Sequence, residues 1–447
     1  MARAVGHATP PGHRPCTLNV SPNASPSRGP FPGYLVALVS TVAIILTAPG
    51  QTMLVSLLNV PLREAFDLQP LWLNTAYTVA TITASLPLVW MGDRIDRHGP
   101  RRMLVVIAVA FGLACLFMAS VAHVAMVVVG FFLLRFFGQG SLALASSHAL
   151  AMWFHRRLGS ISGVRMVALF AAWAPLPGLT LFLFQRIGWR ATWALYGVVV
   201  AVVVGGLSAW LVRDRPEDLG LTLDGDEEPE TDATGGGSDE EPGFSLHEAL
   251  RTRAYWLLVA GAMMPPMIGT AMLFDIQPML GARGIPAEDA ATAVSAWSLT
   301  MAALAIPAGR LVDRRAPGPI IASGLAAVTV SCALLHQAAT SAMAIAAMAT
   351  YALGQSLIAS AVGTSTARYF GRRHHGAIRS SLSRLGVIAT GLGPLVMGAS
   401  VTATGSYRAA LVGFGVICLP AGVASLFLKP PASPDASPRA SEATETR

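Results

Sequence analysis

The chain has 447 residues, of which 53% are hydrophobic and 12% charged, and its formal net charge is +7. Soluble domains carry about 25% charged residues, so the composition excludes an ordinary soluble protein. The basic residues lie between apolar segments rather than on one face, which argues against nucleic acid as a partner. We therefore expect an all-α membrane protein surrounded by a lipid bilayer.

The first half of the chain begins with a polar tail and continues with long apolar runs. Residues 1–32 are rich in proline, serine, glycine and arginine, and we expect a disordered cytoplasmic tail. The apolar segment from Gly33 is too long for the core of a signal peptide. Residues 33–212 have room for six membrane-spanning helices. These are predicted near residues 33–60, 71–91, 103–121, 124–153, 161–185 and 191–212.

The second half repeats this organisation after an acidic linker. Residues 213–250 are rich in glycine, aspartate and glutamate, which predicts a cytoplasmic linker that buries no core. Residues 251–428 contain six more apolar runs, and residues 429–447 are expected to form a disordered cytoplasmic tail. The second set of helices is predicted near residues 254–280, 289–312, 318–337, 342–369, 377–403 and 407–428.

The distribution of arginines predicts the orientation in the membrane. With the N-terminus inside, few basic residues fall on the outer side, as the positive-inside rule requires. Those few are Arg63, Arg186, Arg190, Arg283 and Arg408. Both termini and the linker are therefore expected to be cytoplasmic.

Three short patterns recur in the same order and at nearly the same offset in the two halves. The repeated pairs are residues 154–163 and 370–379, 92–97 and 309–314, and 138–139 and 354–355. Such a repeat indicates two pseudo-symmetric six-helix bundles that enclose a central cavity.

The segment Met91–Arg102 reads Met-Gly-Asp-Arg-Ile-Asp-Arg-His-Gly-Pro-Arg-Arg. It resembles the signature loop of the major facilitator superfamily. The resemblance implies the major facilitator fold, with a loop that latches the bundles on the cytoplasmic side when the cavity is open outward. The alternative is a basic loop that serves topology alone. The gating residues would be Gly92, Asp96, Arg97, Arg101 and Arg102, with Gly309, Asp313 and Arg314 in the repeat.

Two segments near mid-membrane carry polar groups. Leu134–Gly140 resembles the second motif of the superfamily, in which an arginine on helix 4 is often tied to proton coupling. Arg135 is therefore a candidate for substrate binding and coupling, although it could instead bond backbone carbonyls and brace helices 1 and 4. Ala48-Pro-Gly breaks helix 1, so that Gln51 and Thr52 are expected to line the cavity.

Asp275 is the acidic residue expected within a helix of the second half. It is a candidate for proton coupling, because a desolvated carboxyl group can take up a proton. It could equally pair with Arg135 or be solvated at the outer mouth. Tyr77, Tyr351 and Gln355 are further candidates for the cavity wall.

Several shorter patterns are similar to the bacterial monocarboxylate-porter and oxalate/formate-exchanger branch, which implies a monocarboxylate substrate. They are Ala48–Thr52, Trp189-Arg190, Arg215–Gly220 and Tyr369–His374. The chain departs from that branch in helix 8, where Leu299–Ile306 lacks an Asp/Arg pair. Another cation must then receive the carboxylate, either Arg135 or Arg384, although Arg384 could simply extend to the cytoplasmic surface.

We expect a secondary active transporter of a small organic anion, driven by proton symport through alternating access. It would be a monomer in a bacterial inner membrane. The alternatives are an efflux antiporter for drugs or lipophilic cations and, more remotely, a non-transporting membrane sensor. The sequence has no phosphate-binding loop, no metal-ligand spacing and no catalytic cluster, so we expect neither an enzyme nor a cofactor.

Overall fold

The computed structural model describes residues 31–219, 221–225, 243–371 and 375–431. The predicted disordered tails lie almost wholly outside these residues, as do residues 220 and 226–242 of the acidic linker, so the predictions for those residues remain untested. Within the described residues all regular elements are helices.

The first half of the chain forms the following elements. They are α1 (Gly33–Ile45), η1 (Ala48–Gly50), α2 (Thr52–Val55), η2 (Ser56–Leu58), α3 (Asn59–Phe66), α4 (Pro70–Ser85), α5 (Leu88–His98), α6 (Pro100–Ala119), α7 (Val124–Leu133), η3 (Leu134–Leu142), α8 (Ala143–Ala151), α9 (Leu158–Trp173), α10 (Leu176–Val199), η4 (Val200–Val204) and α11 (Gly205–Leu211).

The linker and the second half form the remaining elements. They are η5 (Glu217–Leu219), η6 (Leu223–Gly225), α12 (Leu246–Leu250), α13 (Arg253–Gly281), α14 (Ala287–Arg314), α15 (Pro317–Gln337), α16 (Ser341–Phe370), α17 (His375–Thr404) and α18 (Arg408–Ser425).

These elements make twelve membrane crossings. Ten stretches of the described chain are long and apolar enough to span a bilayer. One of them, Leu158–Leu211, turns back at Gly188, whose φ of 78° is the left-handed conformation that glycine adopts freely, and so crosses twice. The consecutive helices α4 and α5, each too short alone, supply one more crossing. The predicted all-α architecture is thus confirmed.

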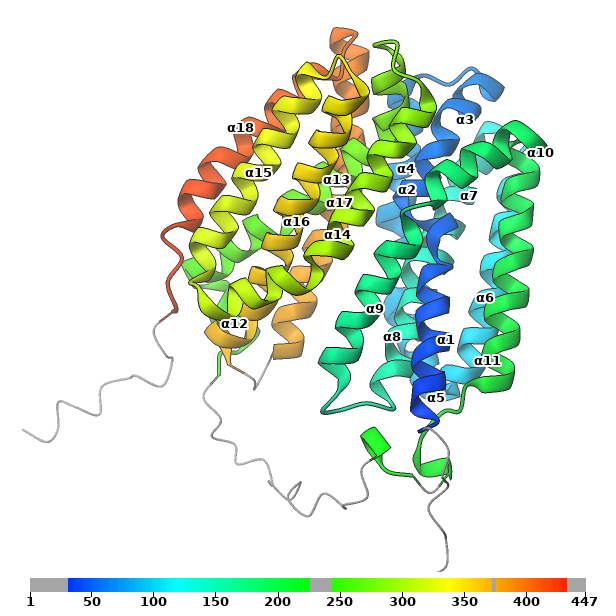
Figure 1. The fold of residues 1–447 in the computed structure, drawn as a ribbon, viewed down its shortest axis with the longest axis vertical. Coiled ribbons are helices and arrows are strands. Elements are labelled where there is room, and N and C mark those ends of the chain that lie inside the picture. Colours follow the sequence, from blue (N-terminus) through cyan, green and yellow to red (C-terminus); the bar gives the residue numbers. More distant parts are fainter. Residues whose placement is uncertain (1–30, 220, 226–242, 372–374, 432–447) are drawn as a thin grey trace, which may run out of the picture.

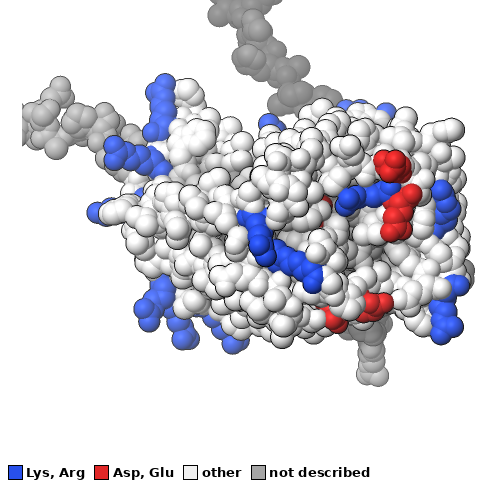
Figure 2. All heavy atoms as spheres, turned by 90° about the horizontal axis from the view of Figure 1, so that it is seen from above, with Lys and Arg blue, Asp and Glu red and all other residues white. Residues whose placement is uncertain are grey.

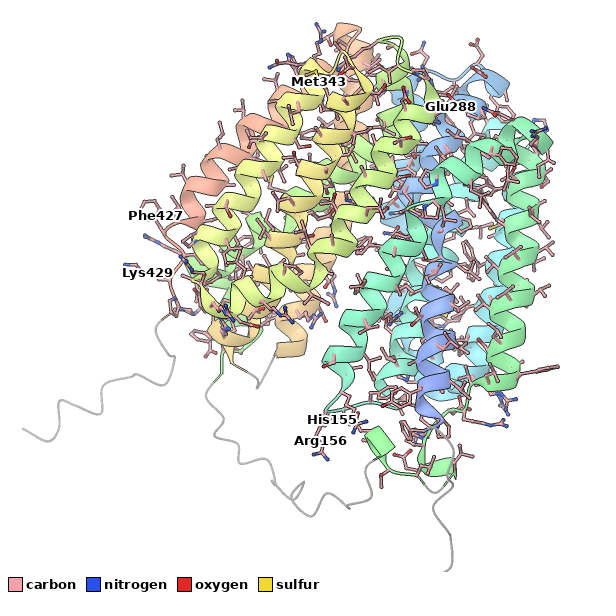
Figure 3. All side chains as sticks on the ribbon, viewed as in Figure 1. His155, Arg156, Glu288, Met343, Phe427 and Lys429 are labelled. Atoms are coloured by element: carbon pink, nitrogen blue, oxygen red, sulfur yellow. The ribbon has the colours of Figure 1, made fainter. Side chains whose placement is uncertain are left out.

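The crossings gather into two bundles, one built from α1–α11 and the other from α13–α18 (Figure 1). We call the end that carries α5, α12 and His155 the linker face. The opposite end, with the turns around residues 67, 284 and 405, is the far face; Glu288 and Met343 also lie there (Figure 3). The expected orientation makes the linker face cytoplasmic.

The bundles converge at the far face and diverge toward the linker face (Figure 1). Helices α4 and α17 make the closest junction, where the Thr78 hydroxyl donates to the Gly391 carbonyl at 2.7 Å. A Cβ on Gly398 would lie only 2.9 Å from the Cβ of Asn74, so the absence of a side chain permits this approach. On the same face, the Gln185 amide donates to the Glu288 carboxylate at 2.9 Å.

The signature segment is helical where a loop was expected. Helix α5 continues to His98, and α14 continues to Arg314, so that only Gly99 (φ 80°) interrupts the chain before α6. The side chains of α5 support its extension beyond the apolar run. The Arg94 guanidinium lies 4.6 Å from the Trp90 ring centre one turn earlier. The predicted end of helix 2 near residue 91 was therefore too early.

The start of the linker is anchored on the first bundle. The buried Asp224 carboxylate accepts backbone N–H bonds from His155, Arg156 and Arg157, at 3.0, 2.8 and 3.2 Å. Burial acts to raise the pKa of Asp224, but these three donors and the Arg157 charge outweigh it and hold the pKa below its ordinary value. The carboxylate is therefore ionised at neutral pH.

The end of the linker is anchored on the second bundle. The Phe244 amide donates to the Phe370 carbonyl at 2.9 Å, and the two rings pack edge to face. The two docking sites are equivalent in the internal repeat, since one begins at Phe154 and the other at Phe370. Although this segment was expected to bury nothing, Asp224 and Phe244 are both buried.

Replacing Asp224 by alanine should lower the free energy of unfolding by about 1–2 kcal/mol, because three backbone donors at the start of α9 lose their acceptor. Thermal unfolding in detergent measures the effect. Glu217→Ala is the matched control, since Glu217 is an exposed acidic residue of the same linker. Equal melting temperatures for the two variants would contradict the anchoring role.

Candidate functional site

Arg135 lies in the wall between the bundles with only neutral partners. Its Nη1 donates to the Gly50 carbonyl at 3.4 Å and to the Thr52 hydroxyl at 3.3 Å, and its guanidinium lies 5.1 Å from the Tyr77 ring centre. The side chain is 3% exposed, and its Nε is buried without a partner. Arg135 therefore braces helix 1, as one alternative predicted, and still retains unused hydrogen-bonding capacity.

The local backbone explains how Arg135 reaches helix 1. Residues Leu134–Leu142 form a π-helical stretch, the irregularity that often marks functional sites. On the other side, Pro49 and the extended backbone of Gln51 interrupt the first crossing and free the Gly50 carbonyl. Gly50 and Gly138 then meet at about van der Waals distance, a contact that only small residues allow.

A small cavity of about 120 Å³ lies beside Arg135. The first bundle supplies Arg135, Gln139, Thr81 and Ser85, and helix α17 supplies Thr390. A second cavity of about 270 Å³ lies in the other bundle and is lined by α13, α16 and α17, including Gln355 and Arg379. Polar groups therefore face the space between the bundles from both sides.

Asp275 is fully buried near the far face and is held by the opposite bundle. The Asn74 amide donates to one carboxylate oxygen at 2.7 Å, and the Asn59 amide donates to the other at 3.3 Å. The same amide nitrogens also reach carbonyls of Phe274 and Pro394. The two asparagine amides thus join α3 and α4 of the first bundle to α13 and α17 of the second. Among the described residues no ion pair links Asp275 to Arg135, so that predicted alternative does not occur in this state.

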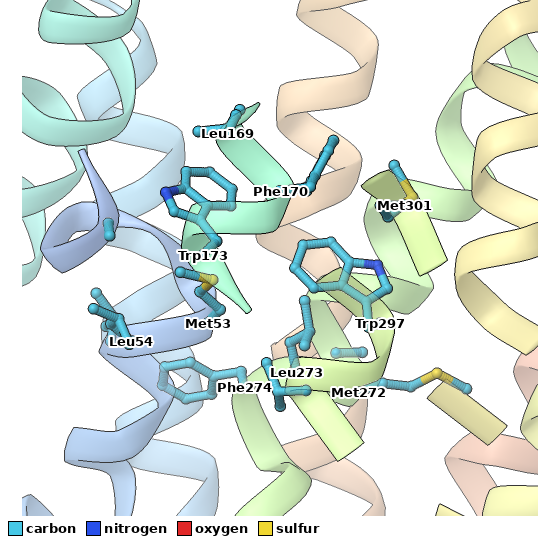
Figure 4. Packing of buried hydrophobic residues seen from close by; sticks show 14 of the residues in the cluster. Met53, Leu54, Leu169, Phe170, Trp173, Met272, Leu273, Phe274, Trp297 and Met301 are labelled. Carbon is cyan, nitrogen blue, oxygen red and sulfur yellow. The ribbon is translucent and has the colours of Figure 1, made fainter. Parts of the chain in front are cut away.

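An aromatic bridge connects the two charged residues. The Tyr77 hydroxyl shares a 2.7 Å hydrogen bond with Thr52, and its ring packs 4.2 Å from the ring centre of Phe274. Phe274 directly precedes Asp275. Nearer the cavity, Phe170 packs edge to face against Trp297 of the other bundle (Figure 4). These contacts bury apolar area between the bundles.

The remaining predicted substrate-binding residues lie at separate places in the structure. The Tyr351 hydroxyl donates to the Pro265 carbonyl at 2.7 Å and supports the proline-containing part of α13. Gln355 lines the second cavity and accepts a 2.9 Å bond from the Trp297 indole. Gln51 bonds to Thr47 within its own crossing. Arg384 is exposed and lines neither cavity, whereas Arg379 lines the larger one.

The predicted gating residues make contacts only within their own bundles. Asp96 lies 3.6 Å from His148, and its repeat counterpart Asp313 lies 3.5 Å from Arg368. The Arg101 guanidinium donates to the Ala209 carbonyl, and among the described residues it has no partner on the second bundle. Arg97, Arg102 and Arg314 are exposed, and open space surrounds the Cα of Gly92 and Gly309. Among the described residues, the contact between the bundles that was expected of these gating residues is not present, and their gating role stays a prediction.

Sequence reasoning missed two buried polar residues. Asn59 was hidden at the end of an apolar run, and only its amide within that run signalled a role. Arg165 lies within α9, where it donates to the hydroxyls of Ser146 and Ser147 at 2.7 and 3.3 Å. Its charge inside a predicted span was the available signal.

A sequence model described as Major Facilitator Superfamily matches residues 40–383 and 267–446. The chain belongs to the major facilitator superfamily. No curated protein matches the sequence. Among solved structures, the chain is similar to a bacterial homologue of the human lysosomal transporter Spinster, in its inward-facing, unoccupied conformation. That match has a TM-score of 0.70 and 16% identity, and it covers 91% of this chain and 100% of the other.

The same homologue in its inward-facing, occupied conformation matches with a TM-score of 0.67, 16% identity and the same coverage. At this identity the likeness establishes the fold. Membership of the superfamily and this fold support a secondary transporter in a membrane.

Replacing Asn74 by alanine should open the far face, because the buried Asp275 carboxylate loses its shorter hydrogen bond at a cost of about 1–3 kcal/mol. Spin labels at Ala65→Cys and Ala403→Cys, on opposite bundles, report the far-face distance by double electron–electron resonance spectroscopy. Thr75→Ala is the control, since that hydroxyl bonds only within its own helix. Identical distance distributions for both variants would show that Asp275 does not hold the bundles together.

Proposed function

We propose that this superfamily member is a proton-coupled symporter of a small organic monocarboxylate. The observation that carries the proposal is the buried Arg135 guanidinium, which has neutral partners only and an unpartnered Nε. An uncompensated cation is costly in a membrane protein and is strongly stabilised by an anion. A carboxylate in the neighbouring cavity would provide that charge.

The cavity walls fit a small polar anion. Arg135 supplies the positive field, while Gln139 and Thr81 offer hydrogen-bond donors around about 120 Å³ of space. Guanidinium groups bind carboxylates through two parallel hydrogen bonds. Thr52 positions Arg135 through a 3.3 Å bond and is itself held by Tyr77. Gln355 and Tyr351 belong to the second bundle, whose cavity wall would move relative to Arg135 during transport.

Asp275 is suited to carry the coupled proton. Burying a neutral carboxylic acid costs much less than burying a carboxylate, so closure of the far face is favoured when Asp275 holds a proton. The Asn59 and Asn74 amides fix its position in the closed state. Transport would thus bring substrate and proton across in the same closure. Release of the substrate at the linker face would follow each closure.

The efflux of lipophilic cations receives less support. That function requires an acidic group in the cavity to receive the cation. Asp275 is fully enclosed in this state, with both oxygens bonded to asparagines, and it lines neither cavity described above. The charge that faces the cavity beside α17 is that of Arg135.

Arg135→Ala should reduce uptake of the transported acid by roughly 10–100-fold, the loss expected for one charge-assisted hydrogen bond of about 1.5–3 kcal/mol. Uptake into proteoliposomes with an imposed proton gradient measures this for labelled lactate, pyruvate, acetate, oxalate and formate beside a cationic dye. Arg186→Ala serves as a control because Arg186 is exposed and lies over Phe182. Dye movement without acid flux in the wild type would overturn the substrate class.

Asp275→Asn should abolish accumulation driven by the proton gradient while leaving exchange of labelled acid between the two sides. The amide retains the shape of the side chain and can accept one of the two asparagine hydrogen bonds, but it cannot carry a proton. Counterflow and gradient-driven uptake in the same vesicle preparation separate these activities. Full gradient-driven accumulation in this variant would assign the proton to another group.

A further inference from the structure

A separate pocket of about 750 Å³ opens on the far face, where the two bundles meet. The first bundle contributes the end of α3 and the turn after it, and the second contributes the turns before α14 and α18. Figure 2 looks onto this face and shows basic side chains near its middle, with acidic ones to one side. The charged and phenolic residues of the pocket are Arg63, Glu64, Asp67, Arg283, Tyr407 and Arg408.

The three guanidinium groups of this pocket have no carboxylate in direct contact among the described residues, and Arg283 donates to the carbonyls of Leu335 and Ala338. Within the described residues none of them has a carboxylate oxygen within 4.0 Å, although Glu64 and Asp67 line the same space. The Nε of Arg63 is buried without a partner. Burial, and next the charge of Arg408, lower the pKa of Arg283, which shows that these two cations repel each other across the pocket.

The counterpart of Arg408 in the repeat is bound differently. Arg190 occupies the equivalent place in the first bundle, just after the turn at Gly188 in α10. Its side chain donates to the carbonyls of Ala119 and Val121. Within the part of the chain that the structure describes, the Arg408 side chain makes no such bond, and its backbone N–H donates to the Ser406 hydroxyl at 3.2 Å. Topology alone explains Arg190, but it does not account for the free guanidinium of Arg408 beside two other cations.

The pocket lies on the far-face side of Asp275. Arg63 acts electrostatically on Asp275, and it also lies beside the Tyr407 hydroxyl. Burial raises the pKa of Tyr407, and the Asp275 carboxylate raises it further. An anion in the pocket would partly neutralise the positive charge of Arg63. It would thereby weaken the electrostatic attraction between Arg63 and the buried Asp275 carboxylate.

We propose that Arg63, Arg283 and Arg408 form a far-face subsite for a small monocarboxylate, with Tyr407 as an additional hydrogen-bond donor. The choice of ligand rests on the proposed function, since the transported acid would meet this site before the far face opens. The subsite concentrates the anion at the closed entrance. Its binding is linked to the release of Asp275 through Arg63.

The test uses a reporter thiol in the pocket rather than transport. Ala282 is exposed and lines the pocket, so Ala282→Cys reacts with water-soluble thiol reagents. The reporter is introduced together with Cys16→Ser, and Cys115, Cys332 and Cys418 are buried. We expect an anionic methanethiosulfonate to react faster than a cationic one by roughly tenfold relative to Ile187→Cys on the same face. Arg408→Gln should remove most of this preference, whereas Arg186→Gln should leave it unchanged.

Benzoate at constant ionic strength should slow the reaction of the Ala282→Cys thiol, and the protection should be lost with Arg408→Gln. Equal protection by chloride would indicate an unselective positive surface and overturn the subsite, as would a charge preference that survives Arg408→Gln. Because no transport is measured, these outcomes are independent of the uptake experiments. Loss of acid uptake in Arg135→Ala without benzoate protection would retain the proposed function and reject the subsite.

Discussion

A buried carboxylate shared between two bundles is the constraint on which this structure depends. Asp275 has no contact with solvent, and its oxygens are satisfied by Asn59 and Asn74 from the opposite bundle. An unpaired carboxylate at that depth would be destabilising by several kcal/mol. The far face can therefore open only if this group is hydrated, and it can close only if the two amides are in place. Closure and the chemical state of Asp275 are in this way coupled.

The second deep charge, Arg135, is kept apart from the first. A direct ion pair would neutralise both groups and leave no role for an anion or a proton. Instead, Thr52, Tyr77 and Phe274 separate them with a hydrogen bond and stacked rings. Under the proposed function, each charge would therefore interact with a ligand of its own.

Much of the architecture could be predicted from the sequence. The apolar runs predicted the crossings, because a bilayer imposes a length on every helix. The repeat predicted two bundles, and the second motif of the superfamily pointed to Arg135. The helical extension past residue 91 was missed, since hydropathy marks where the membrane ends and not where the helix ends.

The pairing between bundles could not be predicted, because it depends on which helix faces meet in three dimensions. Asn59 is 216 residues away from Asp275 in the chain, and its position in an apolar run gives no indication of that partner. Arg384 was grouped with Arg135 by charge alone, but the rotation of α17 leaves it exposed and turns Arg379 toward the cavity. The docking of Asp224 on three backbone amides likewise depends on the fold around it.

The most direct test is the far-face distance between spin labels on the two bundles, followed as a function of pH. The account predicts that raising the pH opens the far face of the wild type, because the ionised Asp275 is costly to bury. The Asp275→Asn protein should remain closed over the same range. An equal pH-dependent opening in both proteins would contradict the claim that Asp275 couples protonation to closure.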